Sequence, residues 1–205
     1  MGEVEVTVQP AHPLLAALAT QRLLPVLRSP EAGAALARTR RLLDAGCRVV
    51  ELTTTTPDWP KALAAARAAA GAEPGVFLGL GTVTTAGQAR EAIAAGADFL
   101  VSPFPAPEAR EVARQAGLTF IEGGFTPAEI ADAASRGPAK VFPAHVGGPR
   151  YLTSLRAVLP SAVLIPAGGI SADAAGDYLA AGALAVGVGS GLPEDPEALA
   201  ALFTP

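Results

Sequence analysis

Lys140 stands where a charged side chain is uncommon, inside the short apolar segment 138–143. It is one of only two lysines in a chain that has thirteen arginines. Burial can lower the pKa of a lysine ammonium towards neutrality, and the free amine is a nucleophile that forms a Schiff base with a carbonyl group. A strand-end lysine whose ammonium reaches solvent is an equally weighted alternative. The other lysine, Lys61, opens an alanine-rich segment and is expected on a solvated helix face.

Glu51 is the second ionisable residue in an apolar, strand-like segment, residues 49–52. Burial raises the pKa of a carboxyl group in general, which suits it to moving protons during a reaction. A structural ion pair with an arginine is the alternative. A lysine and a glutamate in one site could support imine aldol chemistry. The lysine would capture a ketone as an iminium, which accepts the electrons of a breaking C–C bond, and the glutamate would move the protons.

The elements that must position these residues follow a repeat along the chain. Glycine closes a helix-like segment just before an apolar strand-like segment, and most of these glycines follow an alanine: Gly46, Gly71, Gly96, Gly117, Gly137 and Gly182. Glycine readily takes the left-handed conformation that ends a helix. The spacing of 20–25 residues between successive glycines, or 45 for the last pair, suits one strand and one helix per repeat.

Eight strand-like segments result, each followed by a helix-like one. We expect the strands at residues 22–28, 48–53, 76–80, 98–102, 118–122, 139–142, 162–166 and 184–188. Their continuous apolar runs are typical of a parallel sheet covered on both faces. The pattern predicts an α/β fold, a single (β/α)8 TIM barrel over residues 1–205 with a short N-terminal helix at about 13–20. An open doubly wound sheet is the alternative, although no G-x-G-x-x-G follows the first strand.

Composition excludes several function classes. The net charge is −4 with acids and bases mixed along the chain, so no basic patch indicates nucleic-acid binding. We see no apolar run long enough to cross a membrane and no signal peptide, and we expect a cytoplasmic protein. The single cysteine, Cys47, rules out an intramolecular disulfide and a cysteine-based zinc site. It is expected to be a small core residue.

Polar and glycine-rich segments follow the predicted strands, at the end of a barrel where chemistry takes place. Gly168-Gly169 follows the seventh strand and Gly189-Ser190 follows the eighth. Such turns present backbone N–H groups to an anion, most often a phosphate. Arg28 after the first strand, with the threonines after the second, could hold a substrate carboxylate.

Taken together and in their order on the chain, these motifs resemble the 2-keto-3-deoxy-6-phosphogluconate (KDPG) aldolase family of class I pyruvate aldolases. The resemblance covers nearly the whole chain. The motifs that carry it are Val50-Glu51-Leu52-Thr53, Gly79-Leu80-Gly81-Thr82-Val83, Val101-Ser102-Pro103, Gly124-Phe125-Thr126-Pro127, Lys140-Val141-Phe142-Pro143, Gly148-Pro149, Ala167-Gly168-Gly169-Ile170 and Val188-Gly189-Ser190.

The resemblance implies a role for each matching residue. Lys140 would be the Schiff-base lysine and Glu51 the general acid/base. The predicted contacts of the pyruvyl group and its carboxylate are Arg28, Thr55, Thr82, Pro103 and Phe142. The predicted phosphate contacts are Gly168, Gly169, Gly189 and Ser190. The family also implies a homotrimer that needs no metal and no organic cofactor.

The chain departs from the family pattern at several positions. Thr55 stands where some members carry an arginine that helps to bind the carboxylate, and Arg28 could take that role. Ala167 stands where many phosphogluconate-type members have a threonine. Glu122 replaces a proline after the fifth strand, which we expect to place an unusual acid close to the site. His145 lies in the loop after Lys140 and is expected to be a loop residue.

The sequence therefore predicts a lyase that splits KDPG, or its galactonate epimer, into pyruvate and glyceraldehyde 3-phosphate. Two other functions stay open at this stage. One is a sugar-phosphate isomerase or synthase barrel without covalent catalysis, which leaves the strand lysine unexplained. The other is a non-catalytic protein that binds a phosphorylated ligand.

Overall fold

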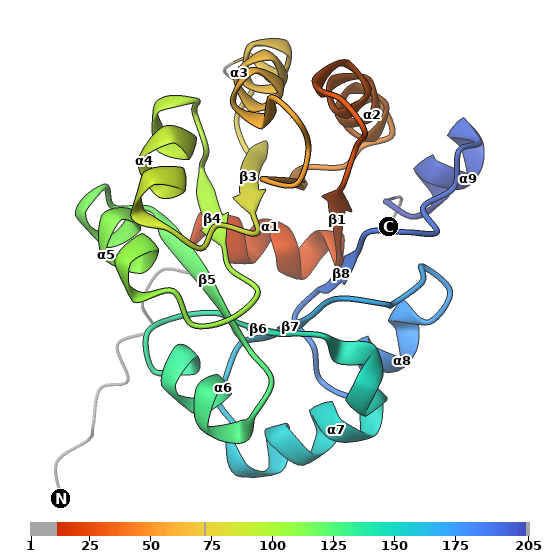
Figure 1. Cartoon of the computed structure of the whole chain (residues 1–205). Coiled ribbons are helices and arrows are strands. Elements are labelled where there is room, and N and C mark those ends of the chain that lie inside the picture. The colour runs from red at the N-terminus through yellow and green to blue at the C-terminus, as the bar shows by residue number, and fades with distance from the viewer. Residues whose placement is uncertain (1–11, 72, 204–205) are drawn as a thin grey trace, which may run out of the picture.

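A computed structural model describes residues 12–71 and 73–203. Its strands are all parallel and form one sheet in the order β7-β6-β5-β4-β3-β2-β1-β8. A bridge between Ala167 and Gly187 joins the two ends of this order, so the sheet closes into a barrel (Figure 1). The strands are Leu23–Leu27 (β1), Val49–Thr53 (β2), Phe77–Gly81 (β3), Phe99–Val101 (β4), Thr119–Gly124 (β5), Ala139–Val141 (β6), Leu164–Pro166 (β7) and Val186–Val188 (β8). The predicted (β/α)8 barrel is confirmed, and the open sheet is excluded.

A ring of helices surrounds the strands, one after each strand, as Figure 1 shows. The helices are Pro13–Gln21 (α1, before the barrel), Ala32–Asp44 (α2), Trp59–Ala70 (α3), Ala86–Ala94 (α4), Pro107–Gln115 (α5), Pro127–Ala134 (α6), Ala144–Val158 (α7), Ala175–Ala180 (α8) and Pro196–Ala201 (α9). The repeated glycines end helices as expected, because Gly46, Gly96, Gly117 and Gly182 all have positive φ. The predicted single domain begins at residue 1, and its first eleven residues lie outside the described part of the chain.

Helix α7 begins soon after β6 and is broken near its start. It starts at Ala144, and the break is at Gly148, whose φ is 65° and ψ is −174°. In its first turn, the N–H groups of Ala144 and His145 donate to the carbonyls of Ala167 and Gly168. This turn therefore ties the end of β6 to the end of β7.

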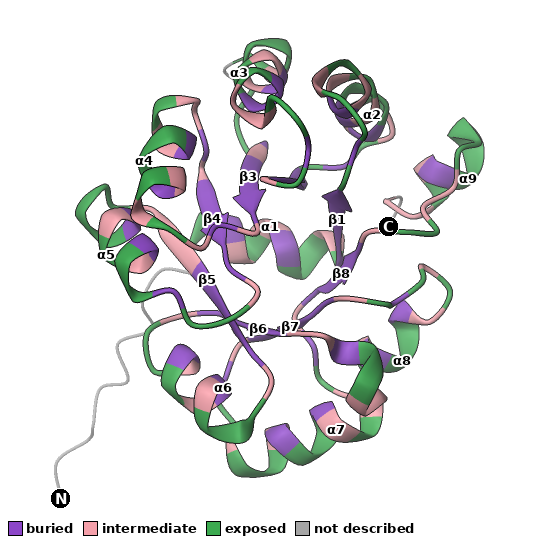
Figure 2. Cartoon of the chain, in the orientation of Figure 1, coloured by how far each residue is buried: buried purple, intermediate pink, exposed green. Residues whose placement is uncertain are grey.

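Alternation along each strand divides the core into two layers. In β1, Leu24 and Val26 belong to the cluster inside the barrel, whereas Leu23 and Leu27 pack into clusters between strands and helices. Figure 2 shows the result as buried strands inside helices whose inner faces are buried and whose outer faces are exposed. A side chain in register with Leu24 or Val26 therefore points into the barrel, where a substrate could meet it.

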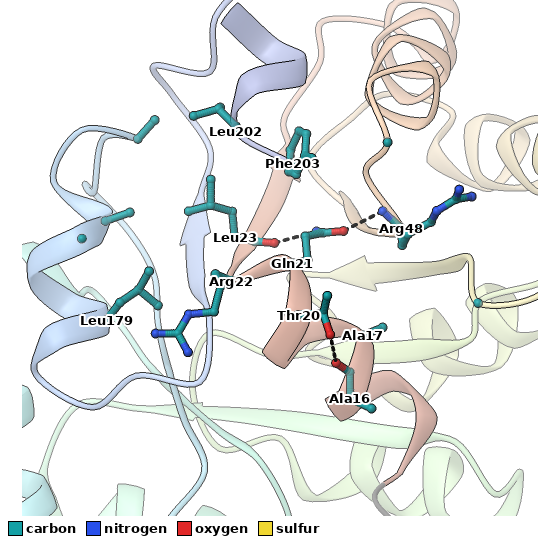
Figure 3. A pocket seen from close by; sticks show the side chains of 15 residues that line it. Ala16, Ala17, Thr20, Gln21, Arg22, Leu23, Arg48, Leu179, Leu202 and Phe203 are labelled. Atoms are coloured by element: carbon teal, nitrogen blue, oxygen red, sulfur yellow. Dashed lines mark hydrogen bonds between the residues drawn. The ribbon is translucent and has the colours of Figure 1, made fainter. Parts of the chain in front are cut away.

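Helix α1 closes the bottom of the barrel. Leu14 and Leu18 are almost fully buried and pack against the interior cluster, which includes Phe99. Gln21 fixes the helix in place, because its amide donates to the carbonyls of Leu23 and Val49 and accepts from the N–H groups of Arg48 and Val49. Figure 3 shows Gln21 between Leu23 and Arg48. In the described part of the chain, no helix is long and apolar enough to cross a membrane.

Candidate active site

Glu51 and Lys140 meet inside the barrel from opposite sides. Glu51 is on β2 and Lys140 is on β6, which is four strands away in either direction around the eight-stranded barrel. Both side chains point inwards, and Lys140 Nζ lies 3.6 Å from Glu51 Oε1. The barrel therefore brings together the two residues that the sequence singled out, which are 89 residues apart in the chain.

The pair is buried and only loosely bonded. Lys140 is 4% exposed and Glu51 1%, so the lysine does not reach out to solvent and the glutamate is not paired with an arginine. A separation of 3.6 Å is an ion pair but not a hydrogen bond. Glu51 Oε1 has no hydrogen-bond partner among the described residues. A buried carboxylate oxygen without a donor is costly in a structural ion pair, and it is available to take a proton from a bound molecule.

Small residues make the space that the pair occupies. A Cβ atom on Gly81 would collide with the Glu51 carboxylate, and one on Gly79 would collide with the Phe99 ring. On the other side of the barrel, Gly123 is the β5 partner of Lys140 and packs against the Pro103 backbone. Glycine is needed in these strands because a neighbouring group lies where a side chain would start.

A cavity of about 340 Å³ reaches Lys140, and seven of the eleven predicted site residues line it. Glu51 is not among them and lies next to Lys140, 3.6 Å from its Nζ. These seven are Arg28, Lys140, Phe142, Gly168, Gly169, Gly189 and Ser190. Lys140 Nζ lies 5.3 Å from the centre of the Phe142 ring, which forms one wall beside the amine. The cavity volume suits a small metabolite.

The glycine turn after β7 approaches the cavity closely. Gly168 and Gly169 both have positive φ, at 91° and 71°. A Cβ atom would meet the Phe142 ring at Gly168 and the His145 imidazole at Gly169. The expectation that His145 lies in a loop is wrong, because it lies in the first turn of α7. Its Nδ1 lies 3.1 Å from the Gly168 carbonyl oxygen, so His145 supports the glycine turn. A backbone of this shape can present N–H groups to an anion.

Arg28 is held at the cavity by threonines. Its Nη1 donates to Thr55 Oγ1 at 3.3 Å, and Thr55 Oγ1 lies 2.8 Å from Thr53 Oγ1. Thr53 Oγ1 in turn donates to the carbonyl of Leu27, the last residue of β1, which directly precedes Arg28. Thr55 therefore acts on the site through Arg28 and does not itself line the cavity.

Two other predicted contacts also lie outside the cavity lining. Thr82 follows β3 with a φ of 61°, unusual for a threonine, and its carbonyl accepts a hydrogen bond from Thr54 Oγ1. Pro103 follows β4 and packs against Gly123. Both are at the correct end of the barrel, but neither is among the residues that form the cavity wall.

The expectation for Glu122 is wrong. Its neighbours Ile121 and Gly123 face the barrel interior, so the side chain of Glu122 points outwards, towards the helices. There it is almost fully buried and accepts from Arg110 Nη1, Arg136 Nη2 at 2.8 Å and the Ala106 N–H. Glu122 is a structural anchor between β5, α5 and α6, away from the cavity.

The structure adds Arg38, which the sequence reasoning missed. It lies on α2 and lines the same cavity as Lys140 and the glycine turns. The only signal in the sequence is a cluster of arginines between residues 38 and 41, which is equally typical of a solvated helix face. In residues 12–71 and 73–203, no group of three or more His, Cys, Asp or Glu residues is arranged to hold a metal ion.

A larger cavity, of about 660 Å³, lies at the bottom of the barrel beside α1 (Figure 3). Among the described residues, its ionisable lining consists of Arg22 and Arg48, without an acid, a lysine or a histidine. In (β/α)8 enzymes the chemistry takes place at the opposite end. The cavity that contains Lys140 is therefore the candidate active site.

Comparison with known proteins agrees with this geometry. The model of the family described as KDPG and KHG aldolase matches residues 15–199. The chain belongs to this aldolase family. It is 36% identical over 154 residues to a probable 2-dehydro-3-deoxy-6-phosphogalactonate aldolase of Rhizobium meliloti, covering 74% of this chain and 72% of that protein. It is 31% identical over 173 residues to the 2-dehydro-3-deoxy-6-phosphogalactonate aldolase of Escherichia coli, covering 83% of each.

A solved structure of the family shares the whole barrel. The KDPG aldolase of Legionella pneumophila, with pyruvate captured as a covalent carbinolamine intermediate, is 28% identical, with a TM-score of 0.83 over 94% of this chain and 98% of that one. Membership of this family makes the protein an aldolase, and thus a lyase.

Proposed function

We propose that the protein is a class I aldolase that cleaves 2-keto-3-deoxy-6-phosphogluconate, or its galactonate epimer, to pyruvate and glyceraldehyde 3-phosphate. The observation that carries the proposal is the buried pair of Lys140 and Glu51 beside a cavity with anion-binding turns. A lysine supplies the amine for a Schiff base, and a carboxylate with a free oxygen supplies the proton acceptor.

In the reaction, the Lys140 ammonium gives a proton to Glu51, and the resulting amine adds to the C2 ketone of the substrate. Glu51 returns this proton to the carbinolamine hydroxyl, which leaves as water, so that the iminium forms and Glu51 is again a carboxylate. Glu51, directly or through a water molecule, takes the proton of the C4 hydroxyl. The C3–C4 bond breaks, its electrons form the enamine, and C4 leaves as the aldehyde of glyceraldehyde 3-phosphate. Protonation of C3 and addition of water then release pyruvate and free Lys140. No metal or organic cofactor is needed.

The two anionic ends of the substrate require separate binding groups. Arg28, held by Thr55, is the proposed contact of the carboxylate, with Thr82, Pro103 and Phe142 around the pyruvyl group. The turns with Gly168, Gly169, Gly189 and Ser190 are the proposed phosphate site, because their N–H groups and hydroxyl can donate to phosphate oxygens. The cavity wall contains six of these residues, which supports the assignment.

A coupled assay of pyruvate release tests the proposed function. Wild-type protein should convert at least one of the two epimers, and Lys140→Arg should lose the activity because a guanidinium does not form the imine. Running both epimers also measures the stereochemical preference, which Ala167 leaves open. Turnover by Lys140→Arg at the wild-type rate would contradict the mechanism.

The non-covalent isomerase or synthase and the non-catalytic binding protein are less consistent with this site. Both explain the glycine turns, but neither gives a reason to bury Lys140 beside Glu51. Family membership also favours the aldolase.

Assembly and location complete the proposal. We expect a homotrimer of 20.5-kDa chains in the cytoplasm, with no nucleic-acid or membrane partner. Light scattering after size-exclusion chromatography measures the assembly, and a mass of one chain would contradict it.

A further inference from the structure

The ionisable side chains that line the active-site cavity are all cationic. They are Arg28 just after β1, Arg38 on α2 and Lys140 on β6, and no acidic side chain of the described residues lines the cavity. The proposed substrate carries a carboxylate and a phosphate. Lys140 is used to form the imine, and Arg28 is held by Thr55 towards one end of the cavity. Arg38 is the remaining cation, and the proposed mechanism gives it no role.

Arg38 reaches the cavity from the flank of α2. The buried face of this helix is formed by Ala35, Thr39 and Leu42, and Arg38 lies beside that face, half-buried. It also lines a groove beside Leu192 and Glu194, and the Glu194 carboxylate there is paired with Arg41. Helical side chains lean towards the N-terminus of their helix, which in this barrel is the end where the strands finish and the active site opens.

The guanidinium of Arg38 has no hydrogen bond or ion pair within the described chain, unlike that of its neighbour Arg41. One turn further along α2, Arg41 is paired with Glu194 at 2.9 Å. A half-buried cation without an acid favours an anionic ligand, because the ligand compensates the lost hydration. The N–H groups of the nearby turns are donors of the same kind but carry no net charge.

We propose that Arg38 is a specificity residue that binds the phosphate of the substrate and makes the enzyme prefer phosphorylated over unphosphorylated sugar acids. This inference rests on the proposed function. The planar guanidinium can donate two hydrogen bonds to one phosphate. It supplies the charge that the turns with Gly168, Gly169, Gly189 and Ser190 lack.

The test compares Arg38→Gln with Arg40→Gln. Arg40 is exposed on the same helix and does not line the cavity, so both variants lose one charge from α2. For each, kcat/KM is measured with 2-keto-3-deoxy-6-phosphogluconate and with the same sugar acid without phosphate. We expect Arg38→Gln to reduce the ratio of the two values by about 10- to 100-fold, the range for a hydrogen bond between charged groups. Arg40→Gln should keep the wild-type ratio.

A lysine variant distinguishes the contribution of the positive charge from that of the two parallel hydrogen bonds of the guanidinium. Arg38→Lys keeps the positive charge but cannot donate two parallel hydrogen bonds to the phosphate. Its ratio of kcat/KM with the phosphorylated substrate to kcat/KM with the unphosphorylated one should therefore lie between those of wild type and Arg38→Gln. An unchanged ratio in Arg38→Gln, or an equal loss with both substrates, would overturn the inference.

Two further measurements separate this inference from the proposed function. Pyruvate trapping at Lys140 reports on the Schiff base alone, so a wild-type protein that neither traps pyruvate nor turns over substrate would refute the function. Calorimetric titration with inorganic phosphate tests Arg38 without turnover. Weaker phosphate binding by Arg38→Gln than by Arg40→Gln supports the inference, and equal binding overturns it whatever the catalytic result.

Discussion

At the scale of single residues, the account depends on what Glu51 does beside Lys140. The carboxylate has an oxygen without a hydrogen bond, 3.6 Å from the amine. It therefore has capacity to accept a proton from the substrate, which a fully bonded carboxylate would lack.

Glu51→Gln keeps the shape of the side chain and removes the proton acceptor. We expect kcat to fall by about 10²- to 10⁴-fold, the usual contribution of a general base, in an assay of pyruvate release. Glu91→Gln, an exposed change on α4, is the control. A Glu51→Gln enzyme within threefold of wild type would remove Glu51 from the mechanism.

Gly81→Ala tests the space around the same carboxylate. The added Cβ would occupy the place of the Glu51 side chain, so the glutamate must move away from Lys140. A displacement of about 1 Å can cost about 100-fold in rate, and we expect a loss of that order in kcat. In Gly87→Ala, the new Cβ meets only Thr85 Oγ1 at 3.8 Å, and activity should be unchanged. Full activity in Gly81→Ala would mean that the position of Glu51 does not matter.

At the scale of elements, two anchors hold the barrel that carries the site. One is helix α1, which closes the bottom of the barrel by packing Leu14 and Leu18 among the interior side chains. The other is Glu122, which joins β5 to α5 and α6 through Arg110 and Arg136. Neither contacts the cavity, so both should affect stability more than chemistry.

Leu18→Ala should lower the free energy of unfolding by about 3 kcal/mol, because it leaves a hole in a fully buried layer. Urea titration measures the change. Val158→Ala, on the exposed face of α7, should have little effect. Equal midpoints for Leu18→Ala and wild type would show that α1 does not close the barrel.

Glu122→Gln should destabilise the protein by about 3 kcal/mol, because it leaves the half-buried Arg110 without its carboxylate and Arg136 with only that of Asp132. Glu111→Gln, which removes an exposed pair with Arg114, should leave the denaturation midpoint nearly unchanged. Pyruvate trapping at Lys140 should persist in the folded Glu122→Gln protein. A folded Glu122→Gln protein that no longer traps pyruvate would show that Glu122 belongs to the active site.

The same carboxyl group predicts a pH dependence of stability. Burial raises the pKa of Glu122, but donation from Arg136, the Ala106 N–H and Arg110 outweighs it and holds the pKa below the usual 4.5. A lowered folded pKa stabilises above the unfolded pKa, and this contribution is lost as pH falls through the folded value. The stability difference between wild type and Glu122→Gln should therefore stay constant from about pH 7 to about pH 5 and shrink below about pH 4. A difference that grows on acidification would contradict this assignment.

At the scale of the whole molecule, sequence patterns predicted the barrel because its signals are local. Apolar runs and closing glycines recur once per unit, and Lys140 and Glu51 are conspicuous where they interrupt such runs. Glu122 was misplaced because a strand signal does not state which way each side chain points. The ladder partner of Lys140 is Gly123, and only this register turns Glu122 outwards.

Arg38 could not be predicted for a different reason. Its contact with the cavity depends on how α2 packs beside β1 and the loop after β8, which local patterns do not specify. Thr82 and Pro103 show the same limit, since they follow the correct strands but do not form the cavity wall.

The most direct test of the account is covalent trapping of pyruvate, measured by intact mass. Wild-type protein and Lys140→Arg are incubated with pyruvate and sodium borohydride. The account predicts a gain of about 72 Da in wild type alone, the mass of a reduced pyruvate imine on one lysine. Peptide mapping should place it on Lys140 and not on the exposed Lys61. No adduct in wild type, or an equal adduct in Lys140→Arg, would contradict Schiff-base catalysis at this site.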